Sequence, residues 1–158
     1  AWNNDLFASP LMEDGTHTDV YYALKEVLRS VQARADIFLH SDVKWVRHTT
    51  GTNKRAKKWW RTNEVPAANE RFRTSDLGSD PITDLSTDIT ALVSRFSSNG
   101  DEYLMVVSKD HTETFDLEFT NTKKIYSVDK KGQLGAITPG DHTLTIDKGD
   151  CVIFKLND

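Results

Sequence analysis

Two adjacent tryptophans lie among cations in the run Lys54-Arg55-Ala56-Lys57-Lys58-Trp59-Trp60-Arg61, the stretch of this 158-residue chain whose residue types best suit ligand binding. Between Val43 and Arg73 the sequence has nine Lys or Arg residues against two Glu residues, a local excess of seven positive charges. Because the whole chain carries a formal charge of −4, the remainder carries −11. The positive charge is therefore concentrated in one segment of an otherwise acidic protein.

Three interpretations of this basic segment differ in what the indoles contact. Cations and rings can bind phosphates and bases, but the acidic remainder would oppose a polyanion and no nucleic-acid module pattern is present, so no nucleic-acid partner is expected. Indoles also pack on sugar rings while cations meet hydroxyl or carboxylate groups. In the third interpretation, which we favour, the indoles cover the fold or a partner domain and the cationic heads are solvated. The candidate carbohydrate contacts are Trp59, Trp60, Lys57, Lys58, Arg61 and Trp45.

The sequence has none of the familiar residue patterns of a catalytic or metal centre. The histidines lack metal-ligand spacing, and neither a nucleophile elbow nor a phosphate-binding glycine loop occurs. Most carboxylates lie in turns or on polar strand faces, where paired glycosidase acids are not expected. Asp147 and Asp150 have oxygens suited to a hard cation such as Ca²⁺, although a hairpin turn explains them equally well. We expect no catalytic residue, metal or cofactor. The histidines are His17, His40, His48, His111 and His142.

The second half of the chain predicts an antiparallel β-sandwich. Short apolar runs with a period of two alternate with polar turns from Asp88 to Leu156, which is typical of a sandwich or barrel. Tyr103–Val107 is apolar throughout, as expected for a central strand. We expect a mainly β fold with about seven or eight strands. The runs include 91–96, 103–107, 115–119, 125–128, 134–137, 143–146 and 152–156.

One amphipathic helix is predicted before the strands. Its apolar stripe consists of Val20, Leu24, Val27, Leu28, Val31, Ala35 and Phe38. Thr16-His17-Thr18-Asp19 can form a capping box, so the helix is expected to begin near Thr16 or Thr18. The stripe requires a partner, and it predicts homo-oligomerisation if the chain is isolated. No run approaches the length of a membrane span. Cys151, the only cysteine, is expected to pack as a small apolar side chain.

Several segments resemble the end of β-galactosidase-like (β/α)₈ glycoside hydrolases. Gly15-Thr16 followed by Tyr21-Tyr22-Ala23-Leu24-Lys25-Glu26-Val27 is similar to the last barrel helix, and Val43–Thr49 is similar to the V-x-H-T strand that opens the accessory sandwich. Glu102–Asp110 resembles a Y-L-M-V-V-N-x-D strand, with Ser108 in place of the common Asn. Pro139-Gly140-Asp141 and Gly149–Leu156 resemble the C-terminal motifs. The Lys54–Arg73 insertion departs from the family.

The resemblance implies a non-catalytic C-terminal accessory domain, because the family's catalytic carboxylates would precede Ala1. Residues 1–42 would be the end of the barrel, and residues 43–158 a sandwich with a basic excursion at about 50–81. Its partners would be the parent's catalytic barrel and, as a further expectation, polysaccharide. A periplasmic or secreted location is favoured. The start at Ala1, without a leader, fits a mature form or a fragment. The alternatives are a free-standing carbohydrate-binding module and a sugar-independent interaction or adhesion sandwich.

Overall fold

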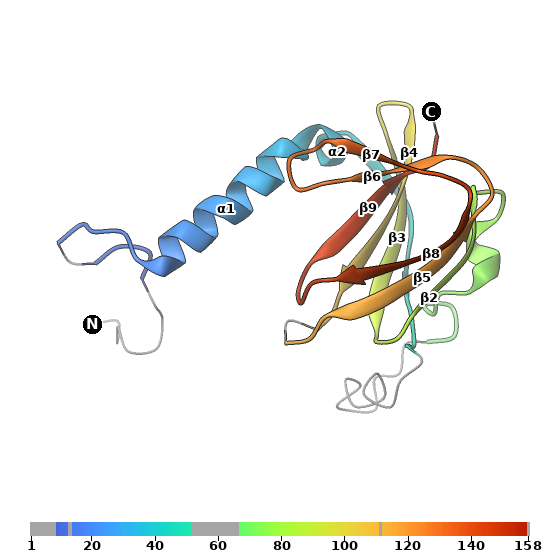
Figure 1. The fold of residues 1–158 in the computed structure, drawn as a ribbon, viewed down its shortest axis with the longest axis horizontal. Helices are drawn as coiled ribbons and strands as arrows, with labels where there is room; N and C mark the ends of the chain where they lie inside the picture. Colours follow the sequence, from blue (N-terminus) through green and yellow to red (C-terminus); the bar gives the residue numbers. More distant parts are fainter. Residues whose placement is uncertain (1–8, 13, 52–66, 111, 158) are drawn as a thin grey trace.

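Two antiparallel sheets packed face to face make up most of the protein (Figure 1). The computed structural model describes residues 9–12, 14–51, 67–110 and 112–157. Six strands form one sheet in the order β1-β3-β4-β9-β6-β7, and three form the other in the order β2-β5-β8. The strands are β1 (Ser41–His48), β2 (Ile82–Thr87), β3 (Ala91–Ser98), β4 (Asp101–Ser108), β5 (Phe115–Asn121), β6 (Ile125–Val128), β7 (Leu134–Ile137), β8 (Gly140–Ile146) and β9 (Cys151–Lys155). The predicted mainly β sandwich is confirmed.

The main core lies between the two sheets, where alternate residues of each strand meet. Phe115, Leu117 and Phe119 of β5 are buried while the residues between them face solvent, as their alternation predicts. Leu104 and Phe154 pack against them from the six-stranded sheet. The hydrophobic effect therefore fixes the register of both sheets, since a slip of one residue would expose this entire face.

A second hydrophobic cluster lies on the opposite face of the six-stranded sheet. Phe96 and Tyr103 stack there with their ring centroids 5.3 Å apart, and Ile153 is fully buried. The short helix α2 (Ala35–Leu39) covers them, because Ile37 packs into the cluster and Phe38 stacks on Phe96. β4 is consequently covered on both faces over part of its length, as its continuous apolar run predicts.

One charged side chain, Arg95, lies on the core side of β3. Its guanidinium nitrogens donate to both carboxylate oxygens of Asp80, at 2.6 and 2.8 Å, and to the backbone oxygens of Phe96 and Tyr103. Glu102 forms a further ion pair with it. Burial alone would lower the pKa of Arg95, but these carboxylates outweigh that effect and raise it. The network joins the segment before β2 to the six-stranded sheet.

Part of the expected excursion at about 50–81 belongs to the sandwich, and residues 52–66 lie outside the described part of the chain. Residues 67–81 run along the sandwich, where the 3₁₀ helix Thr74–Leu77 buries Leu77 in the core. A parallel bridge joins His48 to Arg71, with His48 N–H donating to Glu70 O at 2.7 Å. The strand β2, which follows directly, was not among the expected strands. This segment therefore closes one side of the sandwich.

The helix α1 (Asp19–Ala33) begins at Thr18, within the expected range, but the capping box predicted at Thr16–Asp19 does not form. Thr18 is the N-cap, and its hydroxyl accepts from the N–H of Tyr21 at 3.4 Å. The Thr16 hydroxyl instead donates to Asp14 at 2.7 Å, so it does not cap the helix. The helix also ends earlier than the stripe predicts, because the backbone leaves helical geometry at Arg34 before α2 begins.

Candidate functional site

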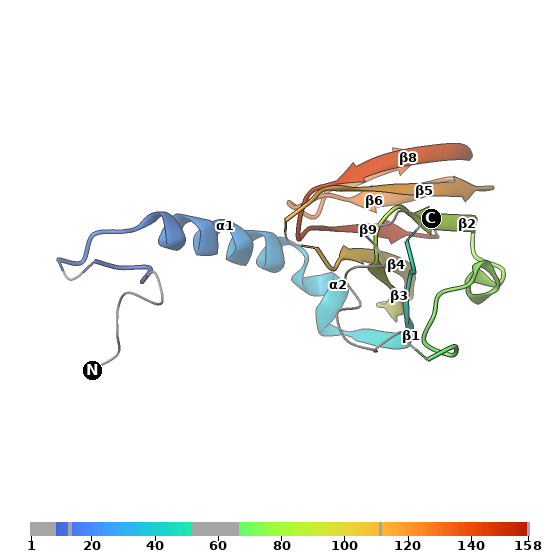
Figure 2. The same ribbon diagram turned by 90° about the horizontal axis from the view of Figure 1, so that it is seen from below.

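The helix α1 projects from the sandwich (Figures 1 and 2), and its apolar side chains are exposed. Leu24, Val27, Leu28 and Val31 are 47%, 59%, 59% and 52% exposed, and none of the residues of α1 is buried. With Val20 they recur at helical spacing, so they form one band along about three turns. We call these five residues the α1 stripe. Soluble domains rarely leave such a band uncovered, which makes it a candidate interaction surface.

Contacts at its C-terminal end hold α1 against the six-stranded sheet. The Arg34 guanidinium donates to the Ser30 hydroxyl at 2.7 Å, and another of its nitrogens lies 3.6 Å from Cys151 Sγ on β9. Gly132, in the β6–β7 turn, passes so close that a Cβ atom there would lie 2.4 Å from the carbonyl oxygen of Ala33. Gly132 also has φ +76°, a conformation that favours glycine. The helix is therefore anchored at one end.

A groove runs where α1 leaves the sheet, and it continues the apolar surface of the stripe. Val27 and Val31 form its helical wall, while Val107 and the half-buried Cys151 form its sheet wall. Cys151 packs beside these apolar groups as expected, although it is not fully buried. Charged side chains rim the groove, including Lys130, whose pKa is raised because it donates to Asp150 at 2.6 Å. The stripe thus extends onto the sandwich.

The far end of α1 is also structured. Thr18 donates through its hydroxyl to Ser9 O at 2.7 Å, and an antiparallel bridge joins Leu11 to His17. The His17 ring stacks on Tyr21 with a centroid separation of 3.7 Å, and Tyr22 meets both rings edge-on. These local contacts form a small folded tip with no sandwich beneath it (Figure 2). Order at the tip therefore depends on the helix and its cap.

Of the predicted carbohydrate contacts, only Trp45 belongs to the part of the chain that the structure describes. Trp45 lies on the core side of β1, packs against the main core and has its ring 6.2 Å from that of Phe72. The Arg47 guanidinium lies 5.9 Å from the indole centroid. These neighbours give Trp45 a packing role, and its contact with sugar stays a prediction. Outside the described residues lie Trp59, Trp60, Lys57, Lys58 and Arg61.

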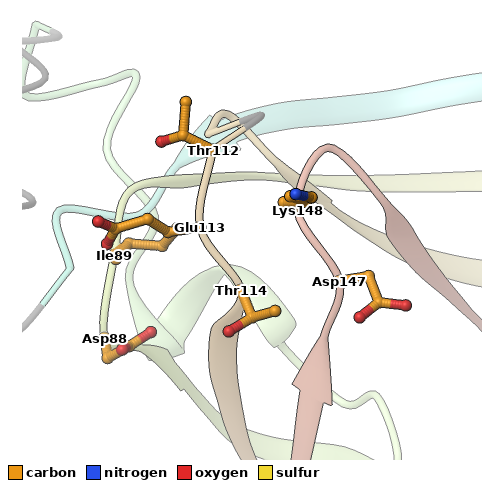
Figure 3. A pocket seen from close by; sticks show the side chains of 7 residues that line it. All are labelled: Asp88, Ile89, Thr112, Glu113, Thr114, Asp147 and Lys148. Atoms are coloured by element: carbon orange, nitrogen blue, oxygen red, sulfur yellow. The ribbon is translucent and has the colours of Figure 1, made fainter.

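A polar pocket lies between three loops at one end of the sandwich (Figure 3). The loops connect β2 to β3, β4 to β5 and β8 to β9, and three carboxylates and one amine reach the pocket from them. The turn at Asp147 is closed by the Asp150 N–H donating to Asp147 O at 3.0 Å. The Asp150 side chain is ion-paired to Lys130, and both aspartates belong to the turn between β8 and β9. The described residues contain no cluster of three metal-ligating side chains. The pocket is lined by Asp88, Ile89, Thr112, Glu113, Thr114, Asp147 and Lys148.

A pair of basic side chains lies near the closed side of the sandwich. Lys109 Nζ is 3.4 Å from His48 Nδ1. The lysine donates in this contact when Nδ1 carries no proton. Burial lowers the pKa of His48, and the charge of Lys109 lowers it further. Burial also lowers the pKa of Lys109. The pKa of each side chain therefore lies below its ordinary value.

Sequence periodicity found the α1 stripe, but it missed the residues that anchor the helix. Arg34 interrupts the apolar pattern and Gly132 lies in an ordinary turn sequence, so neither carries a signal of its partner. Within the described ranges, none of the helices has both the length and the apolarity needed to cross a membrane. No protein-family model, curated protein or solved structure matches this chain.

Proposed function

We propose that this chain is a non-catalytic accessory β-sandwich of a glycoside hydrolase, which supports the catalytic domain of its parent polypeptide through the α1 stripe. The observation that carries the proposal is the stripe itself, an apolar band along a helix that stands clear of its own domain. The resemblance of Gly15–Val27 to a terminal barrel helix supports the same assignment. A sandwich with an anchored, outward helix suits a supporting role.

The energy available from covering the stripe is appreciable. Full burial of a Val or Leu side chain contributes about 1.5–3 kcal/mol, so covering side chains that are half exposed contributes about 1 kcal/mol each. Leu24, Val27, Leu28 and Val31 all belong to this class. A domain seated on α1 would therefore gain several kcal/mol, on the scale of a protein's whole stability.

Polysaccharide contact is the finer part of the proposal. It rests on the residue types of Lys54–Arg61, where indoles can stack on sugar rings and cations can meet hydroxyl or carboxylate groups. Glycan-array binding of the wild-type chain beside a Trp59→Ala/Trp60→Ala double variant tests it, at low and moderate salt. Binding that only the wild type shows supports the sugar contact, and strong salt sensitivity indicates an acidic polysaccharide. Equal binding by both proteins contradicts a role for the indoles.

The supporting role requires a longer polypeptide that contains the catalytic domain, and it is tested in that polypeptide. Val27→Gln/Leu28→Gln makes the stripe polar, whereas Arg29→Lys/Gln32→Asn alters side chains outside both the stripe and the groove without changing net charge. We expect the stripe variant to lower the catalytic domain's thermal midpoint and the control variant to leave it unchanged. Glycoside hydrolysis by the wild-type polypeptide is measured in parallel. Equal midpoints for both variants, or no hydrolysis of any glycoside, would overturn the proposal.

A further inference from the structure

The four edge strands of the two sheets differ in how well they are protected from pairing. β1 and β2 both contain bulges, and the bridge between His48 and Arg71 closes their side of the sandwich. β7 is only four residues long and contains Gly135. β8 has seven residues that pair with β5 in unbroken register. It is therefore the long, regular edge of the protein (Figures 1 and 2).

The register shows which backbone groups of β8 face away from the sheet. Asp88 N–H donates to Asp116 O, so Asp116 and every second residue of β5 direct their backbone groups toward β2. Leu117 and the residues two positions away on either side direct their backbone groups toward β8, where Leu144 pairs with Leu117. The backbone groups of the intervening residues point outward. These residues are Asp141, Thr143 and Thr145, and no described strand pairs with this edge.

We propose that β8 pairs with β8 of a second copy of this chain, antiparallel and about a two-fold axis at Thr143. Two-fold symmetry makes the strands antiparallel and places Thr143 opposite its own equivalent. Asp141 then lies opposite the second copy's Thr145. All three outward-facing positions exchange backbone hydrogen bonds in this register, because each meets a residue whose groups also point outward. The three-stranded sheets join into one continuous sheet across the two copies.

The side chains favour this register over its neighbours. In the β5–β8 ladder, Thr120 donates to Asp141 at 2.7 Å and Thr145 donates to Asp116 at 2.7 Å. The proposed pairing repeats this cross-strand Thr–Asp combination between the copies. A shift that centres the axis on Leu144 would instead oppose Asp141 to Asp147 of the second copy, and like charges directly opposite each other are destabilising. A shift that centres the axis on His142 would place Thr145 opposite Pro139, which has no N–H to donate. The strand is thus most complementary to itself in the register centred on Thr143.

This interface is separate from the surface used in the proposed function. α1 is anchored to the six-stranded sheet, whereas β8 is an edge of the other sheet. Pairing through β8 therefore leaves the α1 stripe available for a catalytic domain. The two surfaces can be tested with different variants of the same 158-residue chain.

Sedimentation velocity over a range of protein concentrations provides the first test. We expect the 17.9 kDa chain to form a dimer as concentration rises, and Thr143→Pro to abolish it. Proline removes an N–H that points outward, so the hydrogen bonds to β5 are retained. Val27→Gln/Leu28→Gln should leave the dimer intact. A monomer at every concentration, or a dimer lost in the stripe variant and kept in Thr143→Pro, would overturn the proposal.

Disulfide trapping tests the pairing of β8 between two copies even if Thr143→Pro fails to fold. In a Cys151→Ser background, Thr143→Cys places two thiols at the axis, where the expected Cα separation of about 5.5 Å for a hydrogen-bonded pair permits a disulfide. Glu118→Cys is the matched control, because Glu118 lies opposite Thr143 on the same sheet face but one strand inward. We expect mild oxidation to cross-link only the first variant. Equal cross-linking of the two would contradict β8 pairing.

Discussion

Replacing Arg95 with Met should be among the most damaging single changes to the fold. Arg95 is 7% exposed and donates to both oxygens of Asp80 as well as to the backbone oxygens of Phe96 and Tyr103. Methionine preserves much of the side-chain volume but supplies no donor and no charge. The substitution therefore leaves Asp80 without its counter-charge in a largely dehydrated position, with its side chain 14% exposed.

The expected cost follows from this burial. Breaking a buried ion pair by removing one partner costs about 3–5 kcal/mol of unfolding free energy, mostly because the remaining charge stays buried. The surface ion pair between Lys44 and Glu102 provides the contrast. Its side chains are 44% and 32% exposed, so Lys44→Ala should cost at most about 1 kcal/mol. Comparing Arg95→Met with Lys44→Ala tests whether the burial of an ion pair sets the loss of unfolding free energy.

Urea unfolding of a double-mutant cycle provides the assay. Asp80→Leu in the Arg95→Met background removes the stranded charge, so the double variant should be at least about 1–2 kcal/mol more stable than the sum of the single losses predicts. Circular dichroism and tryptophan fluorescence should report the same transition in each variant. A loss below about 1 kcal/mol for Arg95→Met, or additive single effects, would refute a buried and coupled pair.

Three further predictions concern other parts of the sandwich. Because the pKa of His48 is lowered in the folded protein, the unfolded chain binds a proton there more readily, and the free energy of unfolding should fall as pH drops below 6.5 toward the folded pKa. Urea titrations at several pH values should show a weaker pH dependence of that free energy for His48→Asn. Gly132→Ala should cost about 1–3 kcal/mol, because a methyl group at positive φ also meets the Ala33 carbonyl, and amide exchange at the C-terminal end of α1 should accelerate. Phe154→Ala removes a fully buried ring and should cost about 3–5 kcal/mol, measured by thermal unfolding; a loss under about 1 kcal/mol would contradict its place in the core.

Periodicity predicted the strands wherever one face is buried and the other is solvated. Phe115, Leu117 and Phe119 alternate cleanly because β5 lies in the middle of a sheet with one dry face. The turn between β3 and β4 has Asn99 and Gly100 at positive φ, a conformation that these residue types tolerate. In these elements the residue types of the turns and the alternation of apolar residues agree with the burial in the structure, so the sequence is sufficient to predict them.

The missed features depend on contacts between distant residues. β2 follows Pro81 and has a register shift between Ile82 and Asp84, so its alternation is broken where it begins. Residues 67–81 were expected to be an excursion because they are polar, yet Leu77 and Phe72 pack on the core and Asp80 is bound to Arg95. A polar segment can be held by two apolar side chains and a few polar contacts, and composition does not show this.

The two candidate surfaces, the α1 stripe and the β8 edge, also differ in whether the sequence predicts them. The α1 stripe was predicted from the spacing of Leu24, Val27, Leu28 and Val31, because periodicity reports which side of a helix is apolar. That the helix stands clear of its own sandwich is a tertiary fact, set by anchors at Arg34 and Gly132 that are distant in sequence. The open edge at β8 was also beyond prediction, because alternation shows burial and not strand order.

The strand order also determines how the sandwich should respond to tension. Ser41 pairs with Ser98, which pairs with Asp101, while Lys155 pairs with Tyr103, so the start of β1 and the end of β9 lie at the same end of the sheet. Pulling these two points apart loads the β1–β3 hydrogen bonds one after another, beginning at Ser41. We expect β1 to peel away at low force in optical-tweezer measurements, whereas shear would require many bonds to fail together. Tension that enters the sandwich along the chain at Ser41 therefore acts first on β1, which is an edge strand.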